Sequence, residues 1–293
     1  MGKIAVVGAT GFFGTKAVEG LLKRGVRPQD IVAIYRNEVK AQALKEKGIE
    51  LRFGDYQSKE FGAQVFEGVD KVLFISGFAL DPLQRVQDHL AVVRAARDAK
   101  VKRIIYTSLA YPEKCQFGLE EVHLVTEHII KASGIPYTIM RNTFYTEVTL
   151  VPDNLKCAVK DGVLYTLAQG HRINFVCRSD MAEAAAAVLV GEGHENKVYE
   201  ITAPATYTYA DIAKILSEVT GKDVKCVETT VEDYTAVLDK HGVPMEARVF
   251  EPVLIQPGLL GGWAECSDSS LANLIGAENV KTPKQIIQEI FQH

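Results

Sequence analysis

Short apolar runs alternate with longer amphipathic stretches along the first half of the chain. Each run is a predicted strand: the segment that ends at Val7, and residues 31–35, 49–53, 71–76, 103–108 and 137–140. Between them, apolar residues recur at helical spacing, as in Ala17, Val18, Leu21 and Leu22, in Leu83, Val86, Leu90 and Val93, and over residues 119–132. Buried strands that alternate with helices predict a parallel sheet with helices on both faces.

The first strand runs directly into a glycine-rich turn and then a helix. Gly8, Gly11 and Gly14 lie in this turn. Small residues at this spacing let the backbone approach a pyrophosphate, whose charge is stabilised by the N-terminus of the following helix. The strand–turn–helix context predicts a dinucleotide site, and the alternative is a tight turn that binds nothing.

The end of the second predicted strand bears on which dinucleotide is bound. An NAD site usually places an acidic residue there for the ribose 2′-hydroxyl. This chain has Arg36 and Asn37 instead, with Lys40 one helical turn further on. A guanidinium group matches a 2′-phosphate, so NADP(H) is favoured and NAD(H) less so. The alternative is that Arg36 is a solvated residue after a strand.

From about residue 146 the alternation becomes irregular. The pattern predicts strands at 174–176 and 197–202, an alanine-rich helix over 180–189, and a helix over 209–219 between Thr208 as N-cap and Gly221 as stop. The predicted fold is α/β, a Rossmann-type doubly wound parallel sheet with a smaller C-terminal α/β lobe. Residues 1–145 are the expected NAD(P)-binding domain. Residues 146–293 are mainly a substrate-binding lobe, with residues of about 172–202 returning to the main sheet.

Composition narrows the class of protein. The chain has 293 residues, 47% of them hydrophobic, a net charge of −4 and no basic run, which argues against a nucleic-acid partner. Five scattered cysteines suit a reducing, cytoplasmic compartment, and neither they nor the histidines show metal-ligand spacing. The N-terminal apolar run is too brief for a signal peptide, and residues 184–190 are too few to span a membrane. A homodimer is left open.

Ligands of such sheets bind beyond the carboxyl ends of the strands, and the loops there carry the candidate substrate residues. Aromatic residues in these loops could sandwich a planar substrate, and the tyrosine hydroxyls could protonate a product. Each could equally pack in the core. Ser108 could orient a substrate carbonyl or merely form a local bond at a strand end. The aromatic candidates are Phe78, Tyr111, Phe144 and Tyr145.

Several motifs together carry a family resemblance. They are GATGFFG, YRN, GDY, LFISG, YTS, HLVTE, PYTIMRNTFYTE and GEGHENKVYE. In this order they resemble the NmrA-like branch of the atypical short-chain dehydrogenases, and within it most of all the second type of bacterial NAD(P)H:quinone oxidoreductase and triphenylmethane reductase. The resemblance implies that NADPH is bound and that its hydride passes to a quinone or another electron-poor aromatic. By position, the implied cofactor contacts are Gly8, Thr10, Gly11, Phe12, Phe13, Gly14, Arg36, Asp55, Ser76, Gly77, and the backbone of Arg141, Asn142 and Thr143.

One departure from the wider superfamily affects the mechanism. Its Tyr-x-x-x-Lys pair falls on Leu119 and His123 here, and leucine cannot donate a proton. Quinone reduction needs less acid catalysis, so holding the two rings at reacting distance would supply most of the rate. His123 has three interpretations: a general acid, a contact to the nicotinamide ribose, or a helix residue paired with Glu127. The predicted catalytic residues are His123, Ser108 and Tyr145.

Two classes of function remain open. The first is an NADPH-dependent reductase of quinones or similar acceptors, which the aromatic loops favour. The second is an NADP(H)-binding redox sensor without turnover, which the missing tyrosine favours. A sugar-nucleotide epimerase is a weaker third interpretation, because it would need the Tyr-x-x-x-Lys pair.

Overall fold

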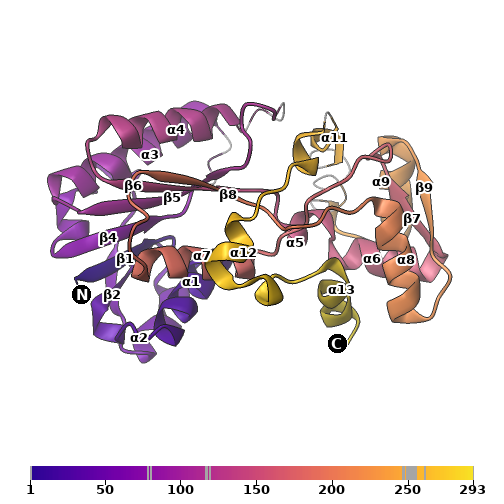
Figure 1. Cartoon of the computed structure of the whole chain (residues 1–293), viewed down its shortest axis with the longest axis horizontal. Helices are drawn as coiled ribbons and strands as arrows, with labels where there is room; N and C mark the ends of the chain where they lie inside the picture. Colours follow the sequence, from indigo (N-terminus) through magenta and orange to yellow (C-terminus); the bar gives the residue numbers. More distant parts are fainter. Residues whose placement is uncertain are drawn as a thin grey trace. The chain divides into compact units, whose positions relative to one another are not determined.

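The computed structural model describes most of the chain as two compact units (Figure 1). The described residues are 2–77, 79, 81–115, 118, 120–245, 248, 256–260 and 262–292. Phe78 and Leu119 therefore lie outside them. The first unit comprises Met1–Pro112, Gly118–Asn142 and Ser179–Ile201. The second comprises Glu113–Phe117, Thr143–Arg178 and Thr202–His293.

A seven-stranded parallel sheet forms the centre of the first unit. Its strand order is β3-β2-β1-β4-β5-β6-β8, and every neighbouring pair is parallel. The order reverses between β1 and β4, which makes a doubly wound sheet and confirms the predicted fold class. The strands are β1 (Lys3–Val7), β2 (Ile31–Tyr35), β3 (Glu50–Phe53), β4 (Val69–Phe74), β5 (Arg103–Leu109), β6 (Tyr137–Asn142) and β8 (Lys197–Ile201).

Helices cover both faces of this sheet (Figure 1). One face packs against α3 (Pro82–Asp98) and α4 (Glu120–Ala132), and α1 (Phe12–Lys23), α2 (Glu38–Glu46) and α7 (Arg178–Val190) lie on the other. Gly20 of α1 lies against α7, because a β-carbon there would be 2.8 Å from Cβ of Ala186. The glycine and the alanine-rich sequence of α7 thus allow the two helices to pack closely.

The buried face of α3 differs from its predicted apolar stripe. Leu83 is 74% exposed, whereas Arg85 and His89 are buried. Hydrogen bonds offset part of the cost of this burial, from Arg85 Nη2 to Ser76 Oγ at 2.6 Å and from the Gly77 N–H to His89 Nε2 at 3.0 Å. The predicted apolar face of α3 is wrong at its N-terminal end. There the polar groups of Ser76 and Gly77, rather than apolar side chains, contact the helix.

The second unit contains a two-stranded parallel sheet and the remaining helices. Thr208 and Asp211 form a capping box at the start of α8, and Gly221 ends the helix with a φ of 68°. The strand predicted at 174–176 is wrong, because Ile173 and Val176 form only isolated bridges. The elements are β7 (Val163–Thr166), β9 (Lys225–Glu228), α5 (Thr146–Thr149), α6 (Pro152–Asp161), α8 (Tyr209–Thr220), α9 (Val231–Lys240), α11 (Gln256–Gly258), α12 (Ser270–Ile275) and α13 (Pro283–Phe291).

Two searches of the described residues gave negative results. No helix in this part of the chain combines the length and hydropathy that crossing a membrane requires. No group of three or more His, Cys, Asp or Glu side chains in the same described ranges is arranged to hold a metal ion.

Candidate functional site

The glycines of the turn before α1 differ in how strictly the fold requires them. Gly8 has a φ of 77°, and a β-carbon at Gly14 would lie 2.3 Å from the Gly8 carbonyl oxygen. The conformation and the packing of the turn therefore require glycine at both positions. A β-carbon at Gly11 would lie 3.4 Å from the same oxygen, which is tight but close to ordinary contact. Packing within the protein thus requires glycine at position 11 less strictly than at position 14. A glycine there leaves room for a ligand to approach the backbone of the turn.

The start of α1 is suited to an anion. Gly11 is the N-cap and supplies no side-chain hydrogen bond to the helix, and no acidic residue lies in the first turn. The N-terminus of a helix leaves backbone N–H groups that intrahelical bonds do not use. Thr10 is half-buried, Phe12 is 47% exposed and Phe13 is buried in the core. The turn thus provides the geometry and polarity that a pyrophosphate needs.

Arg36 follows β2 at the same edge of the sheet. Its side chain is exposed, and Cζ lies 5.1 Å from the centre of the Tyr56 ring. Stacking on an aromatic ring limits the orientations of the guanidinium while leaving its outer N–H groups directed elsewhere. Asn37 is not a ligand candidate, because its side chain caps α2 by accepting from Lys40 N at 3.0 Å. Asp55 accepts from Gln57 N at 3.2 Å in a local turn.

The loop after β4 is tied to the helices beneath it. Ser76 N–H donates to Thr107 Oγ1 at 2.9 Å, and the Gly77 N–H donates to His89 Nε2. A β-carbon at Gly77 would lie 3.1 Å from Tyr56 Oη, so the loop passes close to that ring. The backbone N–H groups of both residues are already engaged, and the Ser76 hydroxyl oxygen accepts from Arg85, so the pair can offer a cofactor the hydroxyl proton of Ser76 and its backbone carbonyls.

His89 is held in one tautomer. Its Nδ1 lies 2.8 Å from Thr126 Oγ1, and the hydroxyl of Thr126 donates to Val122 O at 2.7 Å. Because that hydroxyl proton is used, Nδ1 must carry the hydrogen and Nε2 must be the acceptor of the Gly77 N–H. Burial, and secondly the charge of Arg85, lowers the pKa of His89 to about 3, so the ring is neutral.

His123 is buried in the same polar cluster. Its Nδ1 lies 2.9 Å from Tyr106 Oη, and Nε2 lies 3.5 Å from Arg85 Nη2. The predicted pairing with Glu127 is wrong, since Glu127 bonds to other residues. Burial, Arg85 and His89 hold the pKa of His123 well below its usual value. This environment therefore does not give His123 the pKa near 6.5 that would suit a general acid.

Ser108, Arg141 and Glu200 occupy matching positions on three neighbouring strands. Ser108 Oγ donates to Glu127 Oε1 at 2.6 Å, and Arg141 donates to both oxygens of Glu127 at 2.9 and 3.0 Å. Arg141 Nη1 also donates to Glu200 Oε1 at 3.1 Å. The hydroxyl proton of Ser108 and the guanidinium of Arg141 are thus committed to a protein carboxylate. This leaves the backbone of Arg141, rather than its side chain, as the predicted cofactor contact.

Asn142 has a buried side-chain amide that lacks hydrogen-bond partners within the described part of the protein. Its side chain lies on the face of β6 opposite to that of Arg141, and the residue is 3% exposed. Neither Oδ1 nor Nδ2 has a hydrogen-bond partner among the described residues. A buried amide with both groups unsatisfied is costly, which indicates a bound water or ligand group. The cofactor contact predicted at Asn142 was through its backbone and stays a prediction, and the unsatisfied side-chain amide is a separate feature that the sequence did not indicate.

In the second unit, the predicted aromatic residues have partners of their own. Phe144 packs edge-on against Trp263, with ring centres 5.1 Å apart, and Cζ of Arg178 lies 5.6 Å from the centre of the Tyr145 ring. Phe144 and Tyr145 are half-buried, whereas Thr143 is buried. Trp263 is buried and donates Nε1–H to Gly258 O, as expected for a packing residue. Their contribution to a substrate site stays a prediction, as does that of Tyr111.

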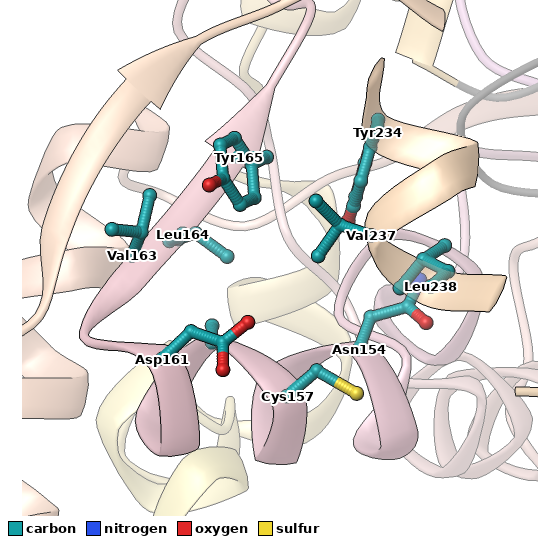
Figure 2. A pocket seen from close by; sticks show the side chains of 10 residues that line it. Asn154, Cys157, Asp161, Val163, Leu164, Tyr165, Tyr234, Val237 and Leu238 are labelled. Carbon is teal, nitrogen blue, oxygen red and sulfur yellow. The ribbon is translucent and has the colours of Figure 1, made fainter. Parts of the chain in front are cut away.

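A small cavity in the second unit is not a substrate site. It lies between α6, β7 and α9, and its volume of about 10 Å³ admits at most one water molecule (Figure 2). Cys157 and Asp161 line it from α6, and Tyr165 and Tyr234 lie across from them. Asp161 is paired with His241 Nε2 at 2.6 Å. The cavity is thus a packing gap of this unit.

Four residues of the polar clusters were not predicted from the sequence. They are Arg85, His89, Tyr106 and Glu200. For Arg85 and His89, the available signal was that polar residues occupy positions of α3 that face the sheet. The others lie on strands whose predicted order and register would be needed to pair them.

Comparison with known proteins agrees with this geometry. A model described as the NmrA-like family matches residues 1–251. Quinone oxidoreductase 2 of Escherichia coli (strain K12) is 38% identical over 82% of each chain. The structure of Citrobacter sp. triphenylmethane reductase complexed with NADP(H) has a TM-score of 0.92 at 37% identity, covering 99% of this chain and 100% of that one.

The structure of the E. coli NADPH-dependent quinone oxidoreductase complexed with NADPH gives a TM-score of 0.87 at 35% identity. It covers 98% of this chain and 99% of that one. These likenesses extend over nearly whole chains and agree with the resemblance that the motifs predicted. The chain therefore belongs to the NmrA-like family.

Proposed function

We propose that this protein is an NADPH-dependent reductase that transfers a hydride to a quinone or a similar electron-poor aromatic acceptor. The observation that carries the proposal is the N-terminus of α1 at Gly11. No side chain caps this end of the helix, and packing within the protein does not by itself require a glycine there. The unsatisfied amide of Asn142 supports it at the other half of the doubly wound sheet. Relatives whose structures hold NADP(H) or NADPH support the choice of cofactor.

Three groups of the first unit would hold the cofactor. The backbone at the start of α1 would take the pyrophosphate, and Arg36 the 2′-phosphate. The amide of Asn142 would take a polar group of the nicotinamide half, because the two halves of a dinucleotide bind on either side of the reversal in strand order. The nicotinamide supplies the hydride when it is bound.

The chain's own contribution to the chemistry is chiefly orientation. His123 is buried and neutral, and the proton of Ser108 is donated to Glu127. An acceptor that is already electrophilic needs a ring held at reacting distance, and water or a tyrosine hydroxyl can deliver the proton that completes the quinol. Tyr111 and Tyr145 stay the predicted donors and ring contacts.

A screen of NADPH consumption tests this proposal. Purified protein would be mixed with NADPH and, in turn, benzoquinone, menadione, a triphenylmethane dye and a conjugated enone, with loss of NADPH absorbance as the signal. Turnover with at least one acceptor is expected, and NADH should support it more weakly.

The second candidate is an NADP(H)-binding redox sensor. The buried, neutral state of His123 favours it, because the site then lacks the acid of ordinary short-chain dehydrogenases. Tight binding of NADPH in calorimetry without turnover of any acceptor would decide for the sensor. No binding at all would reject both candidates.

A further inference from the structure

Tyr111 adopts a backbone conformation that its sequence disfavours. Its φ is 43°, in the left-handed region that bulky residues rarely enter. Pro112 follows it, and proline favours an extended conformation in the residue before it. Glycine or asparagine would make the same turn at little cost. A tyrosine held in this way marks a functional constraint, since such conformations persist where the surroundings impose them.

Glu200 binds the backbone of the residue that adopts this conformation. Its Oε2 accepts the Tyr111 N–H at 2.9 Å, and its Oε1 accepts from Arg141 Nη1 at 3.1 Å. Each carboxylate oxygen thus has a separate donor, so the carboxylate is fixed in rotation as well as in position. A charged acceptor also makes a stronger bond to a backbone N–H than a neutral one does.

The carboxylate is anchored on the rigid part of the molecule. Arg141 is held by two hydrogen bonds to Glu127, which is 1% exposed on its side chain and also accepts from Ser108. Glu200, Arg141 and Ser108 lie side by side across β8, β6 and β5, in register. The loop that carries Tyr111 therefore takes its geometry from three strands and α4 rather than from its own sequence.

We propose that Glu200 is a positioning residue that holds Tyr111 as a rigid contact for the aromatic acceptor. Tyr111 lies just beyond the carboxyl end of β5, at the edge of the sheet where ligands of this fold bind. An aromatic ring fixed in advance pays little ordering cost when it stacks on a planar ligand. The inference rests on the proposed function for the identity of the ligand, but not for the Glu200–Tyr111 contact.

Steady-state kinetics of Glu200→Ala test the role. The KM for the acceptor should rise about tenfold, as expected for loss of a hydrogen bond to a charged group, while the Kd for NADPH changes less than about twofold. Glu195→Ala is the matched control, because it removes another carboxylate that binds an arginine of the sheet, Arg103 at 2.8 Å, at the start of β5. The control should leave the KM unchanged.

A double-mutant cycle with Tyr111→Gly makes the test specific. In that background Glu200→Ala should raise the KM less than about twofold, because glycine has no ring to position. An unchanged effect of Glu200→Ala in the glycine background, or an equal loss of NADPH affinity, would overturn the proposal.

Hydrogen exchange separates this inference from the proposed function. The Tyr111 amide should exchange about ten times faster in Glu200→Ala than in the wild-type or Glu195→Ala protein. If no acceptor is turned over, the proposed function fails, whereas unchanged exchange at Tyr111 would show that Glu200 does not hold the loop.

Discussion

At the scale of single residues, Arg36 is the side chain whose charge distinguishes the two nicotinamide dinucleotides in the proposed site. It is exposed, and its stacking on Tyr56 leaves the planar group partly ordered before a ligand arrives. Neighbouring Asn37 and Asp55 are used in local turns. In the proposed site, preference for NADPH would therefore depend mainly on one guanidinium.

Replacement of Arg36 by alanine should reduce affinity for NADPH about tenfold or more and affinity for NADH less than about twofold. The reason is that only NADPH carries the 2′-phosphate, and a hydrogen bond to a charged group contributes about 1.5–3 kcal/mol. Calorimetric titration with both cofactors measures the difference. Arg27→Ala is a suitable control, because it removes an exposed arginine that pairs with Asp30. Equal losses for both cofactors would contradict the assignment.

His123→Ala should affect stability more than catalysis. The substitution leaves a gap against Tyr106 and removes a partner from its buried hydroxyl, whose pKa is raised to about 12 by burial. A loss of about 1–3 kcal/mol in the free energy of unfolding is expected, with kcat reduced less than about tenfold. Denaturant unfolding and steady-state rates measure the two effects. A stable variant that binds NADPH but turns over no acceptor would instead make His123 catalytic.

At the scale of elements, the β1–α1 unit combines two kinds of glycine. Gly14 lies against the backbone of Gly8 and permits α1 to start where it does, whereas Gly11 faces the open N-terminus of the helix. The same motif thus contains a residue required for packing and one that the proposed cofactor site would require for ligand approach. Substitution can separate the two requirements.

Gly11→Ala should keep the stability of the wild-type protein within about 0.5 kcal/mol and lose NADPH affinity about tenfold or more, because the added methyl group meets the ligand rather than the protein. Gly14→Ala should lower the free energy of unfolding by about 1–3 kcal/mol, because its β-carbon overlaps the Gly8 carbonyl. Thermal unfolding and cofactor titration of both variants check this. Normal NADPH binding by Gly11→Ala would remove the main support for the cofactor site.

At the scale of the whole molecule, buried neutral histidines link folding to pH. His89 and His123 both have lowered pKa values in the folded protein, with burial as the first cause. Below pH 6.5 the unfolded chain binds protons at these positions and the folded chain does not. Their neutral state therefore favours the fold above that pH, and the advantage is lost as the pH falls, for His89 over the range from about 6.5 toward 3.

Stability should accordingly fall when the pH is lowered from about 7 to about 5, by up to about 1.4 kcal/mol per pH unit for each such histidine. Denaturant unfolding at several pH values measures the slope. His89→Gln keeps an acceptor for the Gly77 N–H. It should reduce the slope of the unfolding free energy against pH by the amount that one bound proton contributes, up to about 1.4 kcal/mol per pH unit. His128→Gln, at an exposed position of α4, should not. A slope that His89→Gln leaves unchanged would contradict the account.

The pattern of apolar residues predicted the strands of the main sheet closely. β2 has the predicted ends, and β5 and β8 differ by one residue. β2 and β5 are buried along nearly their whole length, so apolar residues recur there and the signal is strong, whereas β8 lies at the edge of the sheet and is partly exposed. The strand expected at 174–176 failed, because a segment of three residues, Asn-Phe-Val, does not show whether a neighbouring strand exists to pair with it.

Local patterns were enough to predict the fold class and the family correctly, because each depends on residues that are close together in the chain, and the same patterns predict the cofactor turn. The hydrogen-bond partners of the buried polar residues, in contrast, became known only from the folded arrangement of the chain. Glu200 and Tyr111 are 89 positions apart, and Arg85 and His123 are 38 apart. The partner that neutralises, orients or buries a polar side chain is set by strand order and register, and these contacts are invisible to local periodicity.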